Sequence, residues 1–168
     1  YNGAGVDVTF MGAGEIDRVG SVNATLLGPR PTGAGGFIDI TANAKHIVFC
    51  MAFTGKGLIC SYEGNKLNIL KEGTLIKFVN KLQQVSYNGD IGEQKLSVTY
   101  VTERAVFELQ RDGLVLTEIA PGIDLQTQIL DLMEFKPMIS PALKTMDAFL
   151  FREGTPIGIR DYVLNKGK

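Results

Sequence analysis

Lys45-His-Ile-Val-Phe-Cys-Met-Ala-Phe53 is the stretch that decides the fold, because it is apolar nearly throughout. Such a run is typical of a strand that is buried on both faces of a sheet. Upstream, Val6-Asp-Val-Thr-Phe-Met11 alternates and is rich in β-branched residues, so it predicts a second strand that ends at Gly12-Ala-Gly14. Residues 37–44, between the two, fit either a helix or a short strand.

Further strand-like segments lie before and after the buried run in the sequence. Asn88-Gly89 is the strongest hairpin-type turn signal among them. Glycine-containing residue pairs separate several of these segments, as is typical of a sheet built from short strands. These segments are residues 21–27, 58–63, 66–70, 75–79, 96–109 and 114–119.

One helix stands out near the end of the chain. Asp124 is a typical N-cap residue and predicts a helix over residues 125–134. Its apolar residues recur at helical spacing and form one face, made of Leu125, Ile129, Leu132 and Met133. From Phe135 onward, three prolines predict an irregular tail. Residues 1–168 are therefore expected to form one α/β domain, an open mixed sheet flanked by helices.

Composition narrows the function classes. The 168 residues carry 17 Lys+Arg against 18 Asp+Glu, and 45% are hydrophobic, which fits a single globular domain. The balanced charge and the absence of Trp argue against a nucleic-acid module. No run approaches the roughly 18 apolar residues of a membrane span, and no secretory signal is visible, so a cytoplasmic protein is expected.

Residue types that build common metal and catalytic centres are scarce. His46 is the only histidine, and Cys50 and Cys60 are the only cysteines, without CxxC spacing. A zinc site needs three or four such ligands, so no metal site is predicted. Both cysteines lie in apolar runs, which favours buried, reduced thiols, although paired strands would allow a disulfide. Without a Gly-x-Ser-x-Gly elbow, the chain has no self-sufficient catalytic set.

Three Gly-Ala-Gly triplets suggest nucleotide binding, but none continues as G-x-G-x-x-G. Gly33-Ala-Gly-Gly36 still has chemical potential, because glycines let successive N–H groups point at one anionic atom. A helix over residues 37–44 would strengthen that field. The loop fits a phosphate cradle or an oxyanion hole, and it fits an unliganded tight turn equally well.

Val6-Asp-Val-Thr-Phe-Met-Gly12, Gly33-Ala-Gly-Gly36 and Ala44-Lys45 follow one another along the chain. In this order they resemble the β-half of family I CoA-transferases. Three more strings are similar to its propionate/acetate/acetoacetate branch: Val101-Thr-Glu-Arg-Ala-Val-Phe-Glu-Leu109, Leu116-Thr-Glu-Ile-Ala-Pro-Gly-Ile-Asp124 and Asp147-Ala-Phe-Leu-Phe151. The resemblance covers essentially all 168 residues and implies the NagB/RpiA-like fold of that half.

The resemblance implies a CoA transfer between a short-chain acyl-CoA and a carboxylate, through a glutamyl-CoA thioester. The family's nucleophilic Glu precedes the Val-Asp-Val-Thr string, so the chain is expected to be a C-terminal part with no catalytic residue of its own. A solvated carboxylate is expected for its glutamates, with a strand-surface or ion-pair role for Glu103 and Glu118; those weighed are Glu15, Glu63, Glu72, Glu103, Glu118 and Glu153. The expected partners are the N-terminal half and further copies in a dimer or tetramer.

The same resemblance assigns the CoA side of the site to this chain. Gly35 and Gly36 are expected to face the thioester oxygen, and Gly33 to shape the turn. Lys56, between two glycines, can reach a phosphate or the pantetheine, although a solvated loop lysine is an equal alternative. Asn23 falls near the family's substrate pocket. Coenzyme A would be a substrate here, and no permanently bound cofactor is expected.

Two other functions stay open at this point. An acyl-CoA hydrolase of the same fold would let water intercept the covalent intermediate. A non-catalytic sensor would use the glycine loop to hold a small anion or CoA.

Overall fold

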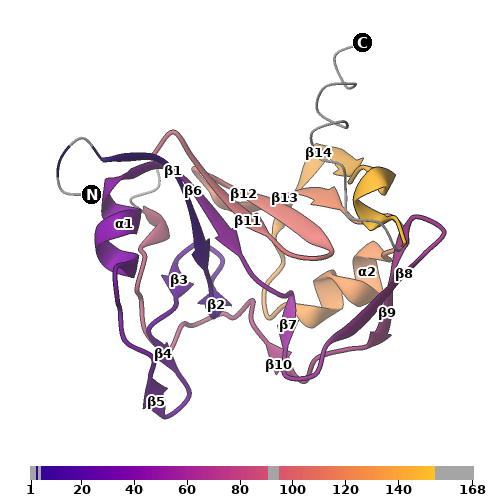
Figure 1. Ribbon diagram of the computed structural model, residues 1–168, viewed down its shortest axis with the longest axis horizontal. Helices are drawn as coiled ribbons and strands as arrows, with labels where there is room; N and C mark the ends of the chain where they lie inside the picture. The colour runs from indigo at the N-terminus through magenta and orange to yellow at the C-terminus, as the bar shows by residue number, and fades with distance from the viewer. Residues whose placement is uncertain (1–2, 4, 91–94, 154–168) are drawn as a thin grey trace.

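The computed structural model describes residues 3, 5–90 and 95–153 of the chain. Its centre is a six-stranded mixed sheet of order β1-β6-β11-β12-β13-β14 (Figure 1). β6 runs parallel to both of its neighbours, β12 is antiparallel to β11 and β13, and β14 returns parallel to β13. The strands are β1 (Val6–Gly12), β6 (Ala44–Cys50), β11 (Ser97–Val101), β12 (Ala105–Gln110), β13 (Gly113–Ile119) and β14 (Met138–Thr145).

The predicted strand over residues 45–53 is β6, although only one of its faces is buried. Ile47 and Phe49 are fully buried on one face, whereas His46 and Val48 on the other face are only partly buried and Cys50 is exposed. The expectation of burial on both faces, and of a buried Cys50, is therefore wrong for the chain as described. β6 and the strand that holds Cys60 are not paired, and both thiols are free.

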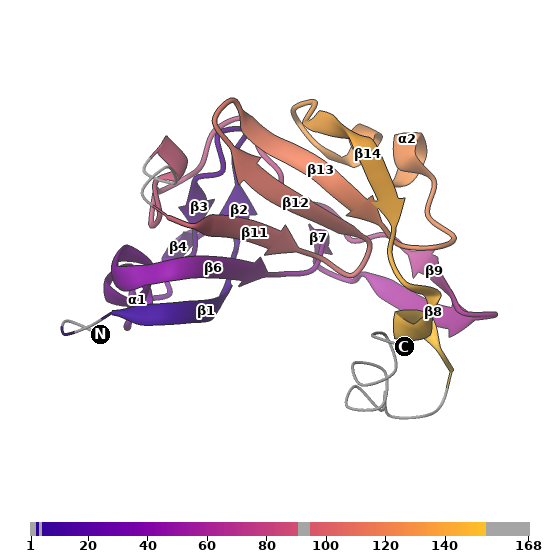
Figure 2. The same cartoon turned by 90° about the horizontal axis from the view of Figure 1, so that it is seen from above.

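Short elements and loops cover the buried face of the sheet, and few helices contribute to this cover. Residues 37–44, which the sequence left open between helix and strand, begin as α1 (Phe37–Asn43). Viewed from above, some of the short strands lie behind the main sheet and others lie beside its end (Figure 2). They form four two-stranded pairs: β2 (Glu15–Ile16) with β3 (Val22–Asn23), β4 (Leu26–Leu27) with β5 (Arg30–Pro31), β7 (Thr54–Gly55) with β10 (Leu75–Ile76), and β8 (Ile59–Glu63) with β9 (Lys66–Lys71).

Aromatic rings join these short elements to the sheet. Phe49 stacks on Tyr100 of the neighbouring strand, with ring centroids 5.3 Å apart. Phe78, which follows β10, lies 4.8 Å from Phe53 and 5.0 Å from Phe107. Aromatic side chains bury more apolar surface than other residues, so these contacts form the centre of the core.

The predicted long helix over residues 125–134 is broken in two. Asp124 caps it as expected, accepting a hydrogen bond from the Thr127 N–H at 2.8 Å. α2 (Leu125–Gln128) then stops at Ile129, whose φ of −128° is not helical, and a 3-10 helix (Leu130–Leu132) follows. Ile129 is fully buried, so its tertiary packing overrides the local helical spacing.

The segment from Phe135, expected to be irregular, contains strand β14 and a 3-10 helix (Ala148–Phe151). The prolines are tolerated because β14 is the last strand of the sheet and its register shifts between Leu116 and Glu118. Residues after 153 lie outside the described part of the chain.

The Asn88-Gly89 pair does not form a two-residue hairpin. Tyr87 instead bridges Val22, and Gly89 packs against the backbone at Val19. A Cβ at Gly89 would lie 2.0 Å from the Val19 carbonyl oxygen, so this glycine is required by a close approach of two chain segments.

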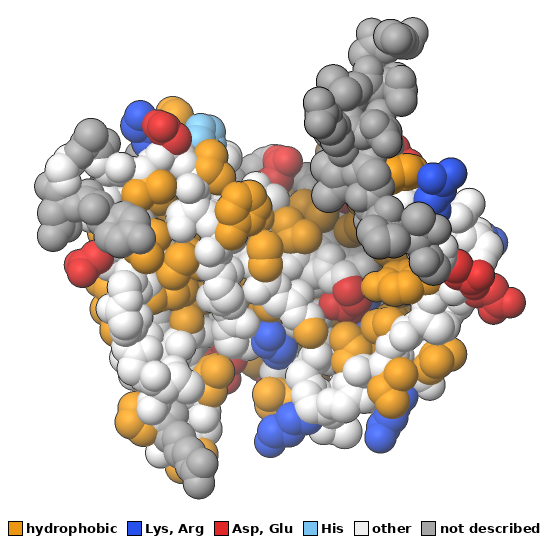
Figure 3. Space-filling model, in the orientation of Figure 1, with side chains coloured by type: hydrophobic (Ala, Val, Ile, Leu, Met, Phe, Trp, Pro, Cys, Tyr) orange, Lys and Arg blue, Asp and Glu red, His pale blue; other side chains and the backbone are white. Residues whose placement is uncertain are grey.

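Among the described residues, the second face of the sheet is open at β1. Val8 and Phe10 on β1 have exposed fractions of 47% and 72%. Figure 3 shows hydrophobic side chains over the region where Figure 1 places β1 and β6. In the described ranges, no helix is long and apolar enough to cross a membrane.

Candidate functional site

A cavity of about 700 Å³ opens beside the carboxyl ends of the parallel strands β1 and β6. Loops collect at this edge of a parallel sheet, which is where α/β proteins usually bind ligands. The lining combines three glycine-containing segments with two lysines and one glutamate. It consists of Gly12, Ala13, Gly14, Glu15, Ala24, Leu27, Gly28, Pro29, Ala34, Phe37, Gly55, Lys56, Leu75 and Lys77.

Of the predicted glycine loop, only Ala34 lines this cavity, next to Phe37 of α1; Gly33, Gly35 and Gly36 are not among the lining residues. Gly33 and Gly35 have φ values of +83° and +51°, in the left-handed region. A Cβ on either glycine would meet nothing within 4 Å, so the backbone conformation rather than space requires them. Gly36 is the N-cap of α1.

Hydrogen bonding leaves part of this loop available. Phe37 N–H closes the turn on the Ala34 carbonyl at 2.9 Å. Among the described residues, the Gly35 and Gly36 N–H groups have no acceptor. Adjacent unoccupied N–H groups of this kind can bind an anionic oxygen, as the sequence prediction for this loop requires.

Lys56 also lines the cavity, so the structure brings it near the glycine loop. Its backbone is left-handed, with φ of 56°, which costs a residue with a Cβ about 1 kcal/mol. The Thr74 N–H donates to the Lys56 carbonyl at 3.2 Å and helps to hold this conformation. A strained residue inside a candidate site points to a functional constraint on its position.

Asn23 lies behind the cavity wall instead of facing the cavity. It is fully buried, and its Nδ2 donates to Glu15 Oε2 at 2.8 Å and to the Leu26 carbonyl at 2.7 Å. Its Oδ1 accepts from the Thr25 and Leu26 N–H groups. Because these bonds use its donors and acceptors, Asn23 shapes the wall and orients the Glu15 carboxylate.

Lys77 is a site residue that the sequence prediction missed. Its Nζ donates to the Ala13 carbonyl at 3.0 Å, and both residues line the cavity. Burial lowers the pKa of the Lys77 ammonium, with the negative charge of Glu103 acting in the opposite direction. A lysine inside the apolar run Leu75-Ile-Lys-Phe78 was the available signal, because such a position predicts partial burial.

A buried ionic cluster supports the loop that holds Lys56. Arg104 is fully buried and pairs with Glu72 and Glu103 at 2.8 and 2.6 Å. Glu72 also accepts a short hydrogen bond from Thr54, two residues before Lys56. The expected ion-pair role of Glu103 is confirmed, whereas the expectation that Glu72 is a solvated carboxylate is wrong.

Hydrogen bonding between opposite charges and burial shift the pKa values of Glu72 and Arg104 in opposite directions. Burial would raise the pKa of Glu72, but hydrogen bonds from Arg104 and Thr54 outweigh it and lower that pKa. Burial would likewise lower the pKa of Arg104, and its hydrogen bonds to Glu72 and Glu103 raise it instead. Glu72 and Arg104 therefore stay ionised at neutral pH.

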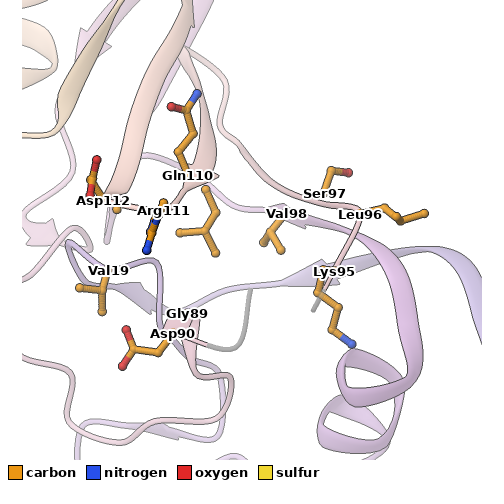
Figure 4. A pocket seen from close by; sticks show the side chains of 12 residues that line it. Val19, Gly89, Asp90, Lys95, Leu96, Ser97, Val98, Gln110, Arg111 and Asp112 are labelled. Carbon is orange, nitrogen blue, oxygen red and sulfur yellow. The ribbon is translucent and has the colours of Figure 1, made fainter. Parts of the chain in front are cut away.

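A second cavity, of about 510 Å³, contains no predicted site residue (Figure 4). Asp90, Lys95, Arg111 and Asp112 are among its lining residues. The ammonium of Lys95 is already engaged, since it donates to the Ala42 carbonyl at 2.5 Å. Within residues 3, 5–90 and 95–153, no group of three or more His, Cys, Asp or Glu side chains is placed to hold a metal ion.

Fold and cavity together define an α/β domain with a ligand-sized site between a glycine loop and two lysines. No family model matches the chain. It is 47% identical over 152 residues to the acetate CoA-transferase YdiF of Escherichia coli K12, covering 90% of this chain and 29% of that protein. It is 43% identical over 159 residues to the caffeate CoA-transferase of Acetobacterium woodii, covering 91% and 30%.

Solved structures of CoA-transferases superpose on this chain. The YdiF acyl-CoA transferase of Escherichia coli O157:H7, in a thioester complex with CoA, superposes with a TM-score of 0.89 at 46% identity. That match covers 92% of this chain and 30% of the other. Glutaconate CoA-transferase from Acidaminococcus fermentans shares the fold, with a TM-score of 0.63 at 18% identity.

The chain belongs to the family I CoA-transferases and corresponds to their β-subunit-like region. The predicted mixed α/β fold is thereby confirmed, with fewer flanking helices than expected. The chain spans less than a third of the length of the first relatives it matches.

Proposed function

We propose that this chain forms the CoA-binding wall of a CoA-transferase that exchanges CoA between a short-chain acyl-CoA and a carboxylate. The observation that carries the proposal is the shared cavity, which is lined by both Ala34 of the glycine loop and Lys56. The relatives' names support the reaction class, and the CoA thioester in the structure of one of them supports the ligand.

In this proposal the nucleophile is a glutamate on the N-terminal half of the enzyme. Its carboxylate attacks the thioester carbonyl, the carbon–sulfur bond breaks, and the CoA thiolate leaves behind an acyl-glutamyl anhydride. The thiolate then attacks the glutamyl carbonyl, releases the acyl group as a carboxylate and forms glutamyl-CoA. An acceptor carboxylate repeats the two steps in reverse.

The contribution of this chain is to stabilise developing charge. The free N–H groups of Gly35 and Gly36 would bind the thioester oxygen as it becomes an oxyanion. Gly33 sets the turn, and Lys56 would donate to a phosphate or to the pantetheine of CoA. Asn23 holds the wall against which the substrate packs.

The wider setting follows from the same proposal. The enzyme would act in the cytoplasm as a homo-oligomer, with CoA as a substrate that leaves after each turnover. Its working site would lie where the N-terminal half meets the cavity of this chain.

Two variants test the oxyanion role against simple backbone strain. Gly35→Ala and Gly64→Ala both place a Cβ at positive φ, 51° and 58°, and neither Cβ meets an atom within 4 Å. Gly64 lies in the β8–β9 turn, away from the cavity. In the enzyme reconstituted with its N-terminal half, Gly35→Ala should lower kcat about 10²-fold, while Gly64→Ala leaves it unchanged.

Trapping experiments test the covalent step. After incubation with propionyl-CoA, borohydride reduction and peptide mass spectrometry should reveal one modified glutamate, located on the N-terminal half. Equal losses of activity in both glycine variants, or no modified glutamate, would rule the proposal out.

A further inference from the structure

Lys77 lines the cavity and makes no ion pair with a described residue, although the negative charge of Glu103, which is paired with Arg104, acts on its ammonium. Its Nζ donates one hydrogen bond to the Ala13 carbonyl at 3.0 Å, and its two other N–H groups can donate to another molecule. The ion pairs among the described residues involve Lys45 and Arg104, not Lys77. An ammonium that is partly removed from water and unpaired is a receptor for an anion.

The carboxylate in the same cavity does not satisfy this charge. Glu15 makes no ion pair with Lys77, and its Oε2 accepts from Asn23 Nδ2 at 2.8 Å and from the Gln83 N–H at 3.2 Å. These two donors fix the Glu15 side chain and offset its charge. The charge of Lys77 is therefore left for an incoming ligand.

The walls around this position indicate what kind of anion fits. Ala24, Leu27, Phe37 and Leu75 supply apolar surface to the cavity. A short aliphatic chain would pack on these side chains, whereas a phosphate has more charged oxygens than the two free N–H donors of Lys77 can satisfy and would lose water on apolar walls. The combination of one ammonium and apolar walls fits a small aliphatic monocarboxylate.

We propose that Lys77 binds the carboxylate of the short aliphatic acid that accepts CoA. This inference rests on the proposed function and adds to it the residue that recognises the acceptor. The Ala13 carbonyl positions the ammonium, and the apolar walls select the length of the acid. CoA itself would be bound through the glycine loop and Lys56 and would not depend on Lys77.

The binding test uses the 168-residue chain and ¹³C-labelled propionate, followed by NMR titration. Lys77→Met, which keeps the length of the side chain and removes its charge, should weaken propionate binding about tenfold to hundredfold. Lys77→Arg should restore most of the affinity. Lys81→Met, at an exposed position outside the cavity, is the matched control and should bind as the parent chain does.

Other ligands separate the sources of the anion. Propionamide, which has the same shape without the charge, should not bind, and inorganic phosphate should bind at least tenfold more weakly than propionate. Tighter binding of phosphate would overturn the proposal and move Lys77 to the phosphate side of CoA. The absence of propionate binding by the parent chain, or equal binding by Lys77→Met with an unchanged melting temperature, would also overturn it.

A calorimetric titration with CoA keeps this inference distinct from the proposed function. CoA binding that is unaffected by Lys77→Met, together with weakened propionate binding, supports both. Propionate binding that requires Lys77 in a chain that does not bind CoA would remove the proposed function while leaving Lys77 as a carboxylate receptor.

Discussion

Arg104 and Glu72 face each other through two hydrogen bonds, 2.8 Å from Nη1 to Oε2 and 3.0 Å from Nη2 to Oε1. The guanidinium also lies 5.0 Å from the centroid of the Phe53 ring and donates to the Gln128 carbonyl at 3.1 Å. One side chain thereby links the β11–β12 turn, the segment before β10 and helix α2. The loop that carries Lys56 is connected to this cluster because the Thr54 hydroxyl donates a hydrogen bond to Glu72.

Removing the negative charge of Glu72 should destabilise the fold. Glu72→Gln leaves the buried Arg104 with one charged partner, and such a loss costs about 2 to 4 kcal/mol. Urea unfolding at neutral pH would measure it. Glu63→Gln, at an exposed position in β8, is the control and should change the free energy of unfolding by less than about 0.5 kcal/mol. Equal effects of the two variants would contradict the importance of the pair.

The same carboxylate gives the chain a predictable dependence on acid. The folded-state pKa of Glu72 is lowered from its ordinary value of 4.5, because hydrogen bonds from Arg104 and Thr54 outweigh burial. Its stabilising contribution is therefore complete above pH 4.5 and is lost as the pH falls through the folded pKa. Melting temperatures of the parent and Glu72→Gln should converge as the pH falls from about 5 through the lowered folded-state pKa of Glu72. A gap that stays constant over this range would contradict the assignment.

Replacing Lys56 by glycine separates the backbone of this residue from its charge. Lys56→Gly relieves the left-handed strain but gains flexibility in the unfolded chain, so stability should change by less than about 1 kcal/mol. CoA affinity should fall about tenfold, since a charge-assisted hydrogen bond is lost. Calorimetric titration and thermal melts on one sample measure both quantities. Unchanged affinity would make Lys56 a solvated loop residue.

Asn23 should matter for stability more than for contact with the ligand. Asn23→Ala leaves the Thr25 and Leu26 N–H groups and the Leu26 carbonyl without this partner, at a cost of about 2 to 4 kcal/mol. Asn23→Asp keeps the two acceptor contacts but opposes Glu15, so it should also destabilise. Chemical denaturation measures both variants. A stable Asn23→Ala protein with weakened CoA binding would instead place Asn23 in the binding surface.

Local patterns predicted several strands well because side-chain alternation is a short-range signal, whereas the run over residues 96–109 splits into β11 and β12, residues 21–27 split into β3 and β4, and residues 75–79 contain only the two-residue β10. β1, β6, β8 and β9 begin and end within two residues of the expected bounds, apart from the end of β6, which stops three residues early. The helix over residues 125–134 was extended too far because its spacing gives no sign of the buried turn at Ile129. β14 was missed because prolines are tolerated in a strand that has a partner on one side only.

The site was harder to predict than the fold. The glycine loop and Lys56 were predicted as binding residues through resemblance, and the structure places Lys56 and Ala34 of that loop at one cavity. Lys77 was missed because its partner, Ala13, is 64 residues away, and only the folded chain brings the two together. The Arg104–Glu72 pair spans 32 residues and escaped notice for the same reason.

β1 forms one border of the described sheet, with Val8 and Phe10 turned outward. A border strand offers a row of unused amide and carbonyl groups to any extended chain that passes. In concentrated samples of this chain alone, these groups and the two apolar side chains would recruit neighbouring copies into aggregates. Phe10→Lys should reduce this aggregation, because a charged side chain on an edge strand opposes its association with another copy.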